Sequence, residues 1–454
     1  MDGMSSISAV DTPTGVPIGF GGSGHEVLKR AHCAYVAESH AVAQLAPGKL
    51  ELLRLYDAPA MERAVSICFW GRSGSLLLQS YLDGHDDLVI IPKNGSAWAY
   101  PFFSQYEYLS VWEKLVAYPT YVELKESAND AFLSGDHAVA PADYYAAIHG
   151  LFAAYGDRPA SWLNARVRFV QFLHVAHAVA AGRRPGNSRP LIVYAQHFLN
   201  DELARQFIAD FPDGRFVHTV RDPISSFDSW YDHQIGVQTY QIAHEPHLLG
   251  HFSSRYLDPS GQTVRTLLRS DRPHAGMEAR SRAIRFEDLH LAPESTMRRL
   301  ADWLDLPFRP CLLASTFNGT PYINRSGGRA WVGPNPGNTQ RRSKNMDGAD
   351  RLMIFALLYE DFLAWNYDCP RILQHRWMRL CLFAVLLLVP MKMELLNLQL
   401  ILRRQVLAAL RNGRIGFACG APLYVIMRRA VMMVFLTMQA PARLMGKRPL
   451  LKLL

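Results

Sequence analysis

The stretch AVSICFWGRSGSL, residues 64–76, consists of an apolar run, a turn of glycine and serine, and the start of a second apolar run. The first run is partly β-branched and ends at Gly71, which predicts a buried strand, and residues 76–82 have helical character. A turn of this kind lets backbone N–H groups converge on an anion at the positive end of a helix. Arg72 adds a delocalised cation, and Ser73 and Ser75 add hydroxyl donors. We therefore predict an anion-binding turn; the alternative is an ordinary strand-to-helix turn.

Outward from this turn, apolar runs alternate with helical patterns along the chain. Further strands are predicted at residues 88–92, 190–194, 215–220 and 282–286. Helices are predicted near residues 25–45 and at 162–181, 201–210, 224–234 and 293–304. Strand and helix in alternation predict an α/β fold of three layers, with a central parallel sheet of about five strands covered on both faces.

The composition is that of a globular protein whose charge is unevenly placed. Of the 454 residues, 49% are apolar and 19% are charged. Residues 371–454 contain 14 lysines and arginines and one acid, Glu394, so this region has a net charge of +13. The other residues together have a net charge of −5, which gives the total of +8. Six scattered cysteines favour a reducing compartment, and residues 1–24 lack the apolar segment of a signal peptide, so a cytoplasmic protein is expected. We expect an N-terminal extension with a helix at 1–60, an α/β domain at 61–370 and a basic helical region at 371–454.

A second motif follows the strand predicted at residues 215–220. Arg221 lies at its carboxyl end, where open parallel sheets bind ligands. Asp222 is placed to cap the next helix, whose first turn holds Pro223. Ser229 lies about two helical turns further on and can face the same anion. The alternative is an arginine paired with a neighbouring aspartate on a solvated surface.

Together the two motifs resemble the PAPS-dependent sulfotransferase family, over residues 64–368. The RSGS segment at 72–75 looks like the loop that binds the 5′-phosphosulfate, and Arg221 and Ser229 reproduce the spacing of the 3′-phosphate site. Three later segments are similar to further family elements, namely the aromatic-Glu-Asp-Leu box at Phe286, the adenine-flanking pair Thr316 and Phe317, and the late loop with Arg325 and Gly327. The resemblance implies a P-loop-like sulfotransferase fold, PAPS as co-substrate and Gly74 among the residues that bind the donor.

This sequence departs from the family pattern at Leu76 and Leu77, where the family often has a second hydroxyl and then a tryptophan that stacks on adenine. The loop cannot be aligned with a Walker A motif, and no carboxylate cluster argues for a metal. Arg72 is expected to neutralise the departing phosphate.

The proton acceptor is predicted to be His197, which ends the strand at 190–194 and resembles the Lys-Thr-His segment of the cytosolic branch of the family. Ala195 replaces the lysine of that segment. His85 and Lys93 are the alternatives for this role.

The acceptor side is predicted to be a helical insertion at residues 93–189, whose many aromatic side chains either bind sugar rings or an apolar tail or form the insertion's core. In the basic region, Arg428 and Arg429 separate two apolar runs, which argues against a helix through the bilayer. We expect helices lying on the anionic inner face of the membrane, with a helical subdomain or oligomer contact as the alternative.

The predicted function is therefore transfer of a sulfonate group from PAPS to a hydroxyl or amine of a small molecule, a saccharide or a lipid-linked acceptor. No nucleic-acid partner is expected. The alternatives are a membrane-associated scaffold on a degenerate sulfotransferase fold and a nucleotide-dependent kinase.

Overall fold

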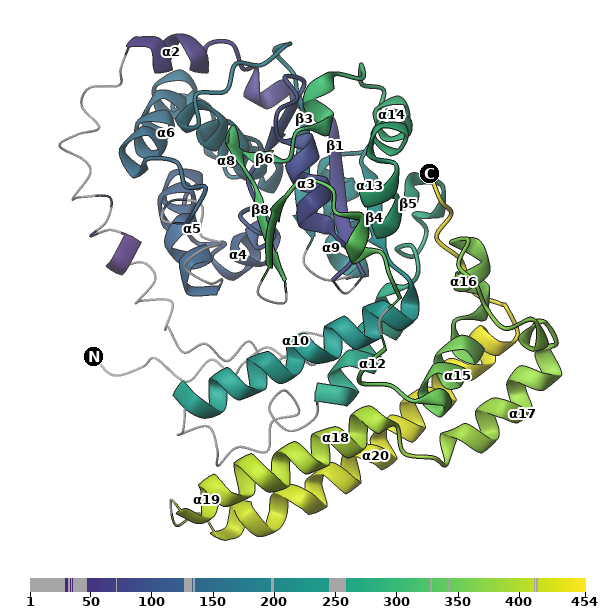
Figure 1. The fold of residues 1–454 in the computed structure, drawn as a ribbon. Coiled ribbons are helices and arrows are strands. Elements are labelled where there is room, and N and C mark those ends of the chain that lie inside the picture. The colour runs from purple at the N-terminus through teal and green to yellow at the C-terminus, as the bar shows by residue number, and fades with distance from the viewer. Residues whose placement is uncertain are drawn as a thin grey trace.

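The computed structural model describes residues 29–31, 33, 35, 47–70, 72–125, 133, 135–196, 200–244, 259–326, 329–341, 343–411, 413 and 415–454. Its centre is a sheet of five parallel strands in the order β2-β3-β1-β4-β5 (Figure 1). The strands are β1 (Ala64–Phe69), β2 (Leu88–Ile90), β3 (Leu191–Gln196), β4 (Arg215–Val220) and β5 (Ser281–Arg285). The predicted parallel sheet and all five predicted strands are confirmed, with small shifts at their ends.

Side chains alternate between the two faces of the sheet and so build two separate cores. From β1, Ala64 and Cys68 pack on one face with the helices between β2 and β3, whereas Val65 and Ile67 pack on the other face. That second core includes residues of α3 (Ser75–Leu82) and α14 (Pro293–Trp303). The arrangement is the predicted one of three layers.

The predicted helical insertion lies between β2 and β3. It comprises α4 (Ala99–Gln105), α5 (Val111–Lys125), α6 (Pro141–Tyr155), α7 (Ala160–Leu163) and α8 (Arg166–Ala180). Four of its aromatic residues (Tyr100, Phe102, Tyr106 and Tyr118) are at most 2% exposed and belong to the apolar core. These four therefore stabilise the insertion, whereas Tyr108 is 72% exposed.

Seven further α-helices are described before the basic region. They are α2 (Pro47–Leu53), α9 (Asp201–Asp210), α10 (Pro223–His244), α12 (Pro259–Ser270), α13 (Phe286–Leu291), α15 (Gly348–Leu357) and α16 (Tyr359–Ala364). Two antiparallel pairs, β6 (Thr316–Phe317) with β7 (Thr320–Pro321) and β8 (Ile323–Ser326) with β9 (Arg329–Val332), were not predicted. Of the helix predicted near 25–45, residues 29–31, 33 and 35 are helical and the rest lies outside the described residues.

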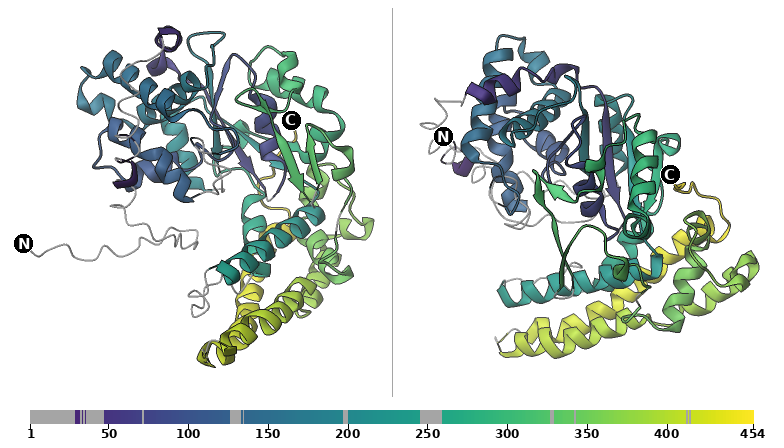
Figure 2. Two further views of the ribbon diagram at one scale, coloured as in Figure 1. Left: turned by 60° about the vertical axis from the view of Figure 1, so that its left-hand side comes forward. Right: turned by 45° about the horizontal axis from the view of Figure 1, so that its top comes forward.

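The basic region forms four helices and a π-helical turn that continue the fold. They are α17 (Arg376–Leu387), α18 (Lys392–Leu400), the π-helix Ile401–Val406, α19 (Leu407–Arg411) and α20 (Ile415–Leu444). A third apolar cluster joins α17, α18 and α20 to α10, α12, α15 and α16. Figures 1 and 2 show that α18 and α19 run antiparallel to α20. This pair of helices lies beside α10, at the carboxyl end of β4.

Ion pairs buried inside the chain attach the basic region to the acidic body. Arg443 pairs with Asp271, and their side chains are 3% and 0% exposed. Arg448 pairs with Asp361 and also lies 3.4 Å from Asp271. Arg379, which is 1% exposed, pairs with Glu360 at 3.1 Å. A buried charge without its partner is costly, so these pairs fix where the region sits.

The last residues of the chain cover the open edge of β5. Ala283 N–H donates to Lys452 O at 2.7 Å, and Leu454 N–H donates to Ala283 O at 2.9 Å. Leu453 thereby pairs in parallel with Ala283. A strand edge with unpaired backbone groups invites association with other chains, and this contact removes part of that edge.

We predict a pH-dependent link between α15 and α18 at Asp350, which is 1% exposed and accepts Lys392 N–H at 3.1 Å. Burial, with the neighbouring Asp347 carboxylate, raises the pKa of Asp350 to about 6 from 3.8. The folded state then binds more protons than the unfolded state between these values, so stability falls as the pH rises from about 4 to about 6. Relative to wild type, the Asp350→Asn variant should gain up to about 3 kcal/mol in unfolding free energy between pH 4 and pH 7. Denaturant titrations at both pH values measure this difference, and a pH-independent difference would contradict it.

Candidate functional site

The predicted anion turn lies between β1 and α3 and has a left-handed backbone at two positions. Arg72 has φ of 55° and Gly74 has φ of 85°. Gly74 precedes the first residue of α3, and Leu78 N–H donates to Gly74 O at 3.0 Å. The N–H groups of the first turn of α3 have no intrahelical acceptor in helix geometry, so they can bind an anion.

The hydroxyl of Ser73 points into the protein rather than into the turn. It accepts Trp70 N–H at 3.2 Å and lies 2.8 Å from Thr219 Oγ1. Ser73 is 1% exposed, whereas Arg72 is exposed and Ser75 is half-buried. The Ser73 side chain thus fastens the turn to β4, and Arg72 and Ser75 remain at the surface of the turn.

Arg221 brings the second motif into contact with the first. Its Nη1 donates to Arg72 O at 3.4 Å, and its Nη2 donates to Asn338 O at 3.4 Å. The guanidinium also lies 4.4 Å from the centre of the Phe286 ring. The same ring approaches Gly74 so closely that a Cβ atom there would lie 2.6 Å from Phe286 Cδ2. Three predicted donor-site residues, Gly74, Arg221 and Phe286, therefore form one cluster.

The segment after Arg221 is braced by contacts from distant parts of the chain. Asp222 caps α10 as predicted, since its Oδ1 accepts Ser225 N–H at 2.9 Å. Asp222 N–H donates to Glu287 Oε1 at 3.2 Å, and Tyr367 donates to the other oxygen of Glu287. Arg341 Nε donates to Asp222 Oδ2 at 2.8 Å. Glu287 and Arg341 thus hold the strand end from which Arg221 projects.

His290 also belongs to this cluster and was not predicted. Its ring lies 4.4 Å from that of Phe286, and its Nδ1 accepts Asn335 N–H at 2.8 Å. Burial, with the nearby Arg221 charge, lowers the pKa of His290 to about 4, so the ring is neutral at pH 7. Because Nδ1 accepts a hydrogen bond, Nε2 carries the proton, and this buried donor has no partner in the described structure.

Other predicted donor-site residues lie apart from the cluster. Thr316 Oγ1 donates to Asp83 Oδ2 at 3.0 Å. Asp83 follows the last residue of α3, so Thr316 is one helix length, roughly 12 Å, from the turn at Gly74. Phe317 is 0% exposed and contacts His137 and Tyr322.

Three further predicted residues have incomplete structural descriptions. Ser229 lies half-buried on α10. Arg325 lies on β8, but only its backbone is described. Gly327 lies outside the described residues.

The predicted base, His197, lies outside the described residues, but the residues Gln196 and Asn200 on either side of 197–199 are described. On one side, Gln196 Oε1 lies 3.3 Å from Ser66 Oγ and 3.4 Å from Cys68 Sγ. On the other, the Asn200 side chain caps α9 by accepting two backbone N–H groups. Gln196 and Asn200, the described residues on either side of 197–199, are therefore each held by internal contacts.

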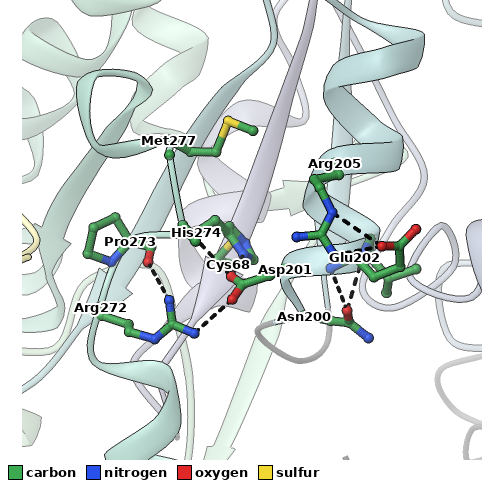
Figure 3. Close-up of polar contacts among 12 residues, drawn as sticks. Cys68, Asn200, Asp201, Glu202, Arg205, Arg272, Pro273, His274 and Met277 are labelled. Atoms are coloured by element: carbon green, nitrogen blue, oxygen red, sulfur yellow. Dashed lines mark hydrogen bonds and ion pairs between the residues drawn. The ribbon is translucent and has the colours of Figure 1, made fainter. Parts of the chain in front are cut away.

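A chain of polar groups at the start of α9 joins Cys68, His274 and Asp201 (Figure 3). Cys68 Sγ lies 3.7 Å from His274 Nε2, and His274 Nδ1 lies 3.3 Å from Asp201 Oδ1. Burial raises the pKa of the Cys68 thiol to about 12 and lowers the pKa of His274. A neutral thiol is a poor nucleophile, so this chain has a structural role in holding the start of α9.

The two alternative bases differ in their surroundings. His85 has both ring nitrogens occupied, by Pro307 O at 2.8 Å and by Asp87 N–H at 3.1 Å. Lys93 is 7% exposed and has φ of 57°. It lies near His137, whose pKa is lowered by desolvation and by the Lys93 charge. Lys93 therefore combines burial with a left-handed backbone, whereas both ring nitrogens of His85 are bound.

No group of three or more histidine, cysteine, aspartate or glutamate side chains that could hold a metal ion is found among the described residues. A cavity of about 600 Å³ lies at the amino ends of the strands, lined by residues that include Arg63, Leu191 and Arg215. It opens at the edge of the sheet opposite to the cluster at Gly74, so it is separate from the candidate donor site.

Comparison with known proteins identifies the class to which this fold and site belong. The model of the sulfotransferase family matches residues 65–310, more than half of the chain, and the chain belongs to that family. The comparison with curated proteins gives no match.

Among solved structures the chain is similar to three sulfotransferases. The first is the sulfotransferase domain from the curacin biosynthetic pathway, with 17% identity over 68% of this chain and 99% of that chain and a TM-score of 0.38. The second is the sulfotransferase domain of the Synechococcus PCC 7002 olefin synthase, with 17% identity over 69% of this chain and 99% of that chain and a TM-score of 0.38. The third is sulfotransferase STF9 from Mycobacterium avium, with 16% identity over 63% of this chain and 73% of that chain and a TM-score of 0.31.

Proposed function

We propose that the protein transfers a sulfonate group from PAPS to a hydroxyl or amine of an acceptor. The observation that carries the proposal is the contact between Arg221 and the turn at Gly74. This contact places the Arg221 guanidinium, at the end of β4, next to the first-turn N–H groups of α3, which follows β1. A nucleotide with phosphates at both its 3′ and 5′ positions needs two such adjacent groups.

In this proposal the turn and the cations position the donor and stabilise the leaving group. The first-turn N–H groups of α3, Arg72 and Ser75 would hold the 5′-phosphosulfate, and Arg221 with Ser229 would hold the 3′-phosphate. The new bond joins the acceptor oxygen or nitrogen to sulfur, and the bond from sulfur to the 5′-phosphate oxygen breaks. Arg72 would neutralise the charge that develops on that oxygen. His197 would take the acceptor's proton, with Lys93 as the alternative.

Titration calorimetry with PAP, the product of the donor, tests this function on the full chain. We expect a dissociation constant below about 1 µM without metal, since two phosphates meet charge-assisted donors. ATP with Mg²⁺ should bind much more weakly, and tight metal-dependent ATP binding would favour a kinase. Consumption of labelled PAPS in the presence of a membrane lipid extract then tests transfer itself.

A second candidate is a scaffold protein on a degenerate sulfotransferase fold. It is favoured by the full burial of Phe317 and the internal bond of Thr316 to Asp83, which occupy two expected adenine contacts. Absence of PAP binding in the calorimeter would support the scaffold and exclude donor use.

A further inference from the structure

The helix α20 has two apolar faces, and the protein covers only one of them. Its inner stripe recurs every four residues at Met432, Leu436, Ala440 and Leu444, which are 0–6% exposed and pack in the third apolar cluster. Its outer stripe is left at the surface. The outer stripe consists of Leu423 (60% exposed), Ile426 (62%), Met427 (60%), Val431 (46%), Val434 (60%) and Met438 (73%), and Met445 (42%), directly after the helix, continues it. A soluble surface helix normally presents polar residues on the face away from the core.

Neighbouring helices extend the same exposed surface. Most of the large apolar side chains that the described chain exposes come from residues 372–445. Outside α20 the most exposed of these are Ile372 (57%), Trp377 (73%), Val385 (63%), Leu388 (73%) and Leu395 (55%). Such a concentration of large exposed apolar side chains in one region is unusual on a soluble monomer and marks an interaction site. We name the exposed apolar side chains of α17, α18, α19 and α20 the outer apolar surface.

The charge around the outer apolar surface favours an anionic partner. Residues 371–454 contain a single acid, Glu394, and it is bound to Arg429 at 2.7 Å. Exposed cations remain at Arg371, Arg376, Arg403, Arg411 and Lys447. A second copy of the chain would bring two such cationic surfaces together, which is unfavourable. A bilayer with anionic headgroups offers both acyl chains for the apolar residues and negative charge for the arginines.

From these observations we propose that the outer apolar surface lies on an anionic lipid bilayer, in the interface plane. The cytoplasmic leaflet is the one that carries such lipids in most membranes. Two stretches, Arg376–Arg403 and Ala418–Leu444, are long and apolar enough to cross a membrane; each contains an 18-residue window, of mean hydropathy 1.9 and 1.5 respectively. The structure favours lying over crossing, because the inner face of α20 is held to the body.

Two ion pairs hold that inner face. Arg443 on α20 pairs with the fully buried Asp271 next to α12. Arg429 in the middle of α20 pairs with Glu394 on α18 and donates to the carbonyls of Leu387 and Val389. Only the outer stripe of α20 is therefore available to acyl chains, which is the geometry of a helix in the membrane interface.

Flotation of the full chain with vesicles measures this docking. We expect the wild-type chain to float with vesicles of phosphatidylcholine and phosphatidylglycerol. Replacing the outer stripe in the triple variant Ile426→Asn, Val434→Asn and Met438→Gln should weaken binding at least about tenfold. The variant Arg403→Gln with Arg411→Gln should weaken binding to the same vesicles by about tenfold, with a smaller effect at high salt.

The matched control is a triple variant of exposed apolar residues elsewhere, Tyr108→Asn, Phe152→Asn and Leu291→Asn, which are 72%, 51% and 58% exposed. It should float like the wild type. Thermal unfolding of each variant verifies that its fold is kept. The flotation assay contains no sulfonate donor, so its outcome does not depend on the proposed function. Unchanged flotation of the outer-stripe variant would overturn the proposal, as would equal flotation with neutral vesicles. A dimer in lipid-free solution that the outer-stripe variant alone dissociates would also overturn it, in favour of self-association.

Discussion

Replacing Arg221 with alanine is expected to lower the affinity for PAP by about a hundredfold. The side chain is 7% exposed and lies between the carbonyl of Arg72, the carbonyl of Asn338 and the ring of Phe286. Both hydrogen bonds to carbonyls are 3.4 Å long, and a doubly charged phosphate is a stronger acceptor than either carbonyl. Losing two charge-assisted bonds of about 1.5 kcal/mol each gives a factor of this order. Titration calorimetry measures it directly.

Two further variants separate a lost phosphate contact from a damaged fold. Arg221→Lys keeps the charge but loses the planar fork that stacks on Phe286, so an intermediate loss of about tenfold is expected. Arg298→Ala removes a half-exposed arginine of α14 that pairs with Glu294, and it should leave PAP binding unchanged. If Arg221→Ala bound PAP as tightly as the wild type, the donor site would have to lie elsewhere.

Substituting Gly74 with alanine should both destabilise the fold and abolish donor binding. Gly74 has φ of 85°, and an added Cβ would lie 2.6 Å from Phe286 Cδ2, which no real contact tolerates. We expect a loss of about 2–4 kcal/mol in unfolding free energy from strain and overpacking together. Displacement of the Phe286 ring would also move the Arg221 guanidinium that stacks on it.

Gly276→Ala supplies the matched control, because Gly276 has a similar φ of 77° but no atom within 4 Å of an added Cβ. It should cost only the backbone strain of about 1–2 kcal/mol and leave PAP binding intact. The double variant Gly74→Ala with Phe286→Leu should recover part of the lost stability, since the overlapping ring atoms are removed. Equal unfolding free energies for the two single glycine variants would show that the contact with Phe286 has no energetic role.

The sheet was predictable because its strands are short, apolar and separated by regular helical patterns. The strand β4 and the helix α9 have the bounds that the sequence predicted. The contact between Arg221 and the turn also followed from parallel strands, whose carboxyl ends meet at one edge of the sheet. Local pattern and topology together were sufficient for this part of the site.

The rest of the site depends on contacts that local patterns do not encode. Glu287, His290 and Arg341 lie about 65–120 residues beyond Arg221 in the sequence, and their contacts with this strand end are not encoded by any local pattern. The strand pairs β6–β7 and β8–β9 are too short to give an alternating pattern. The helix α20 continues through Arg428 and Arg429, which separated two apolar runs in the sequence, because Glu394 of another helix neutralises Arg429.

The order in which the helices are stacked sets the distance between the donor site and the proposed membrane surface. An acceptor that is anchored in lipid must extend at least this far. The helices α10 and α12 separate the carboxyl edge of the sheet from the pair formed by α18 and α20 (Figure 1). A helix with its side chains is about 10 Å across, so two such thicknesses put the Gly74 turn roughly 20 Å from the outermost side chains of α20. A compact phospholipid headgroup cannot extend that far above the acyl chains. An acceptor held in the bilayer therefore needs a long hydrophilic portion, such as an oligosaccharide of several rings, for its terminal hydroxyl to reach the donor.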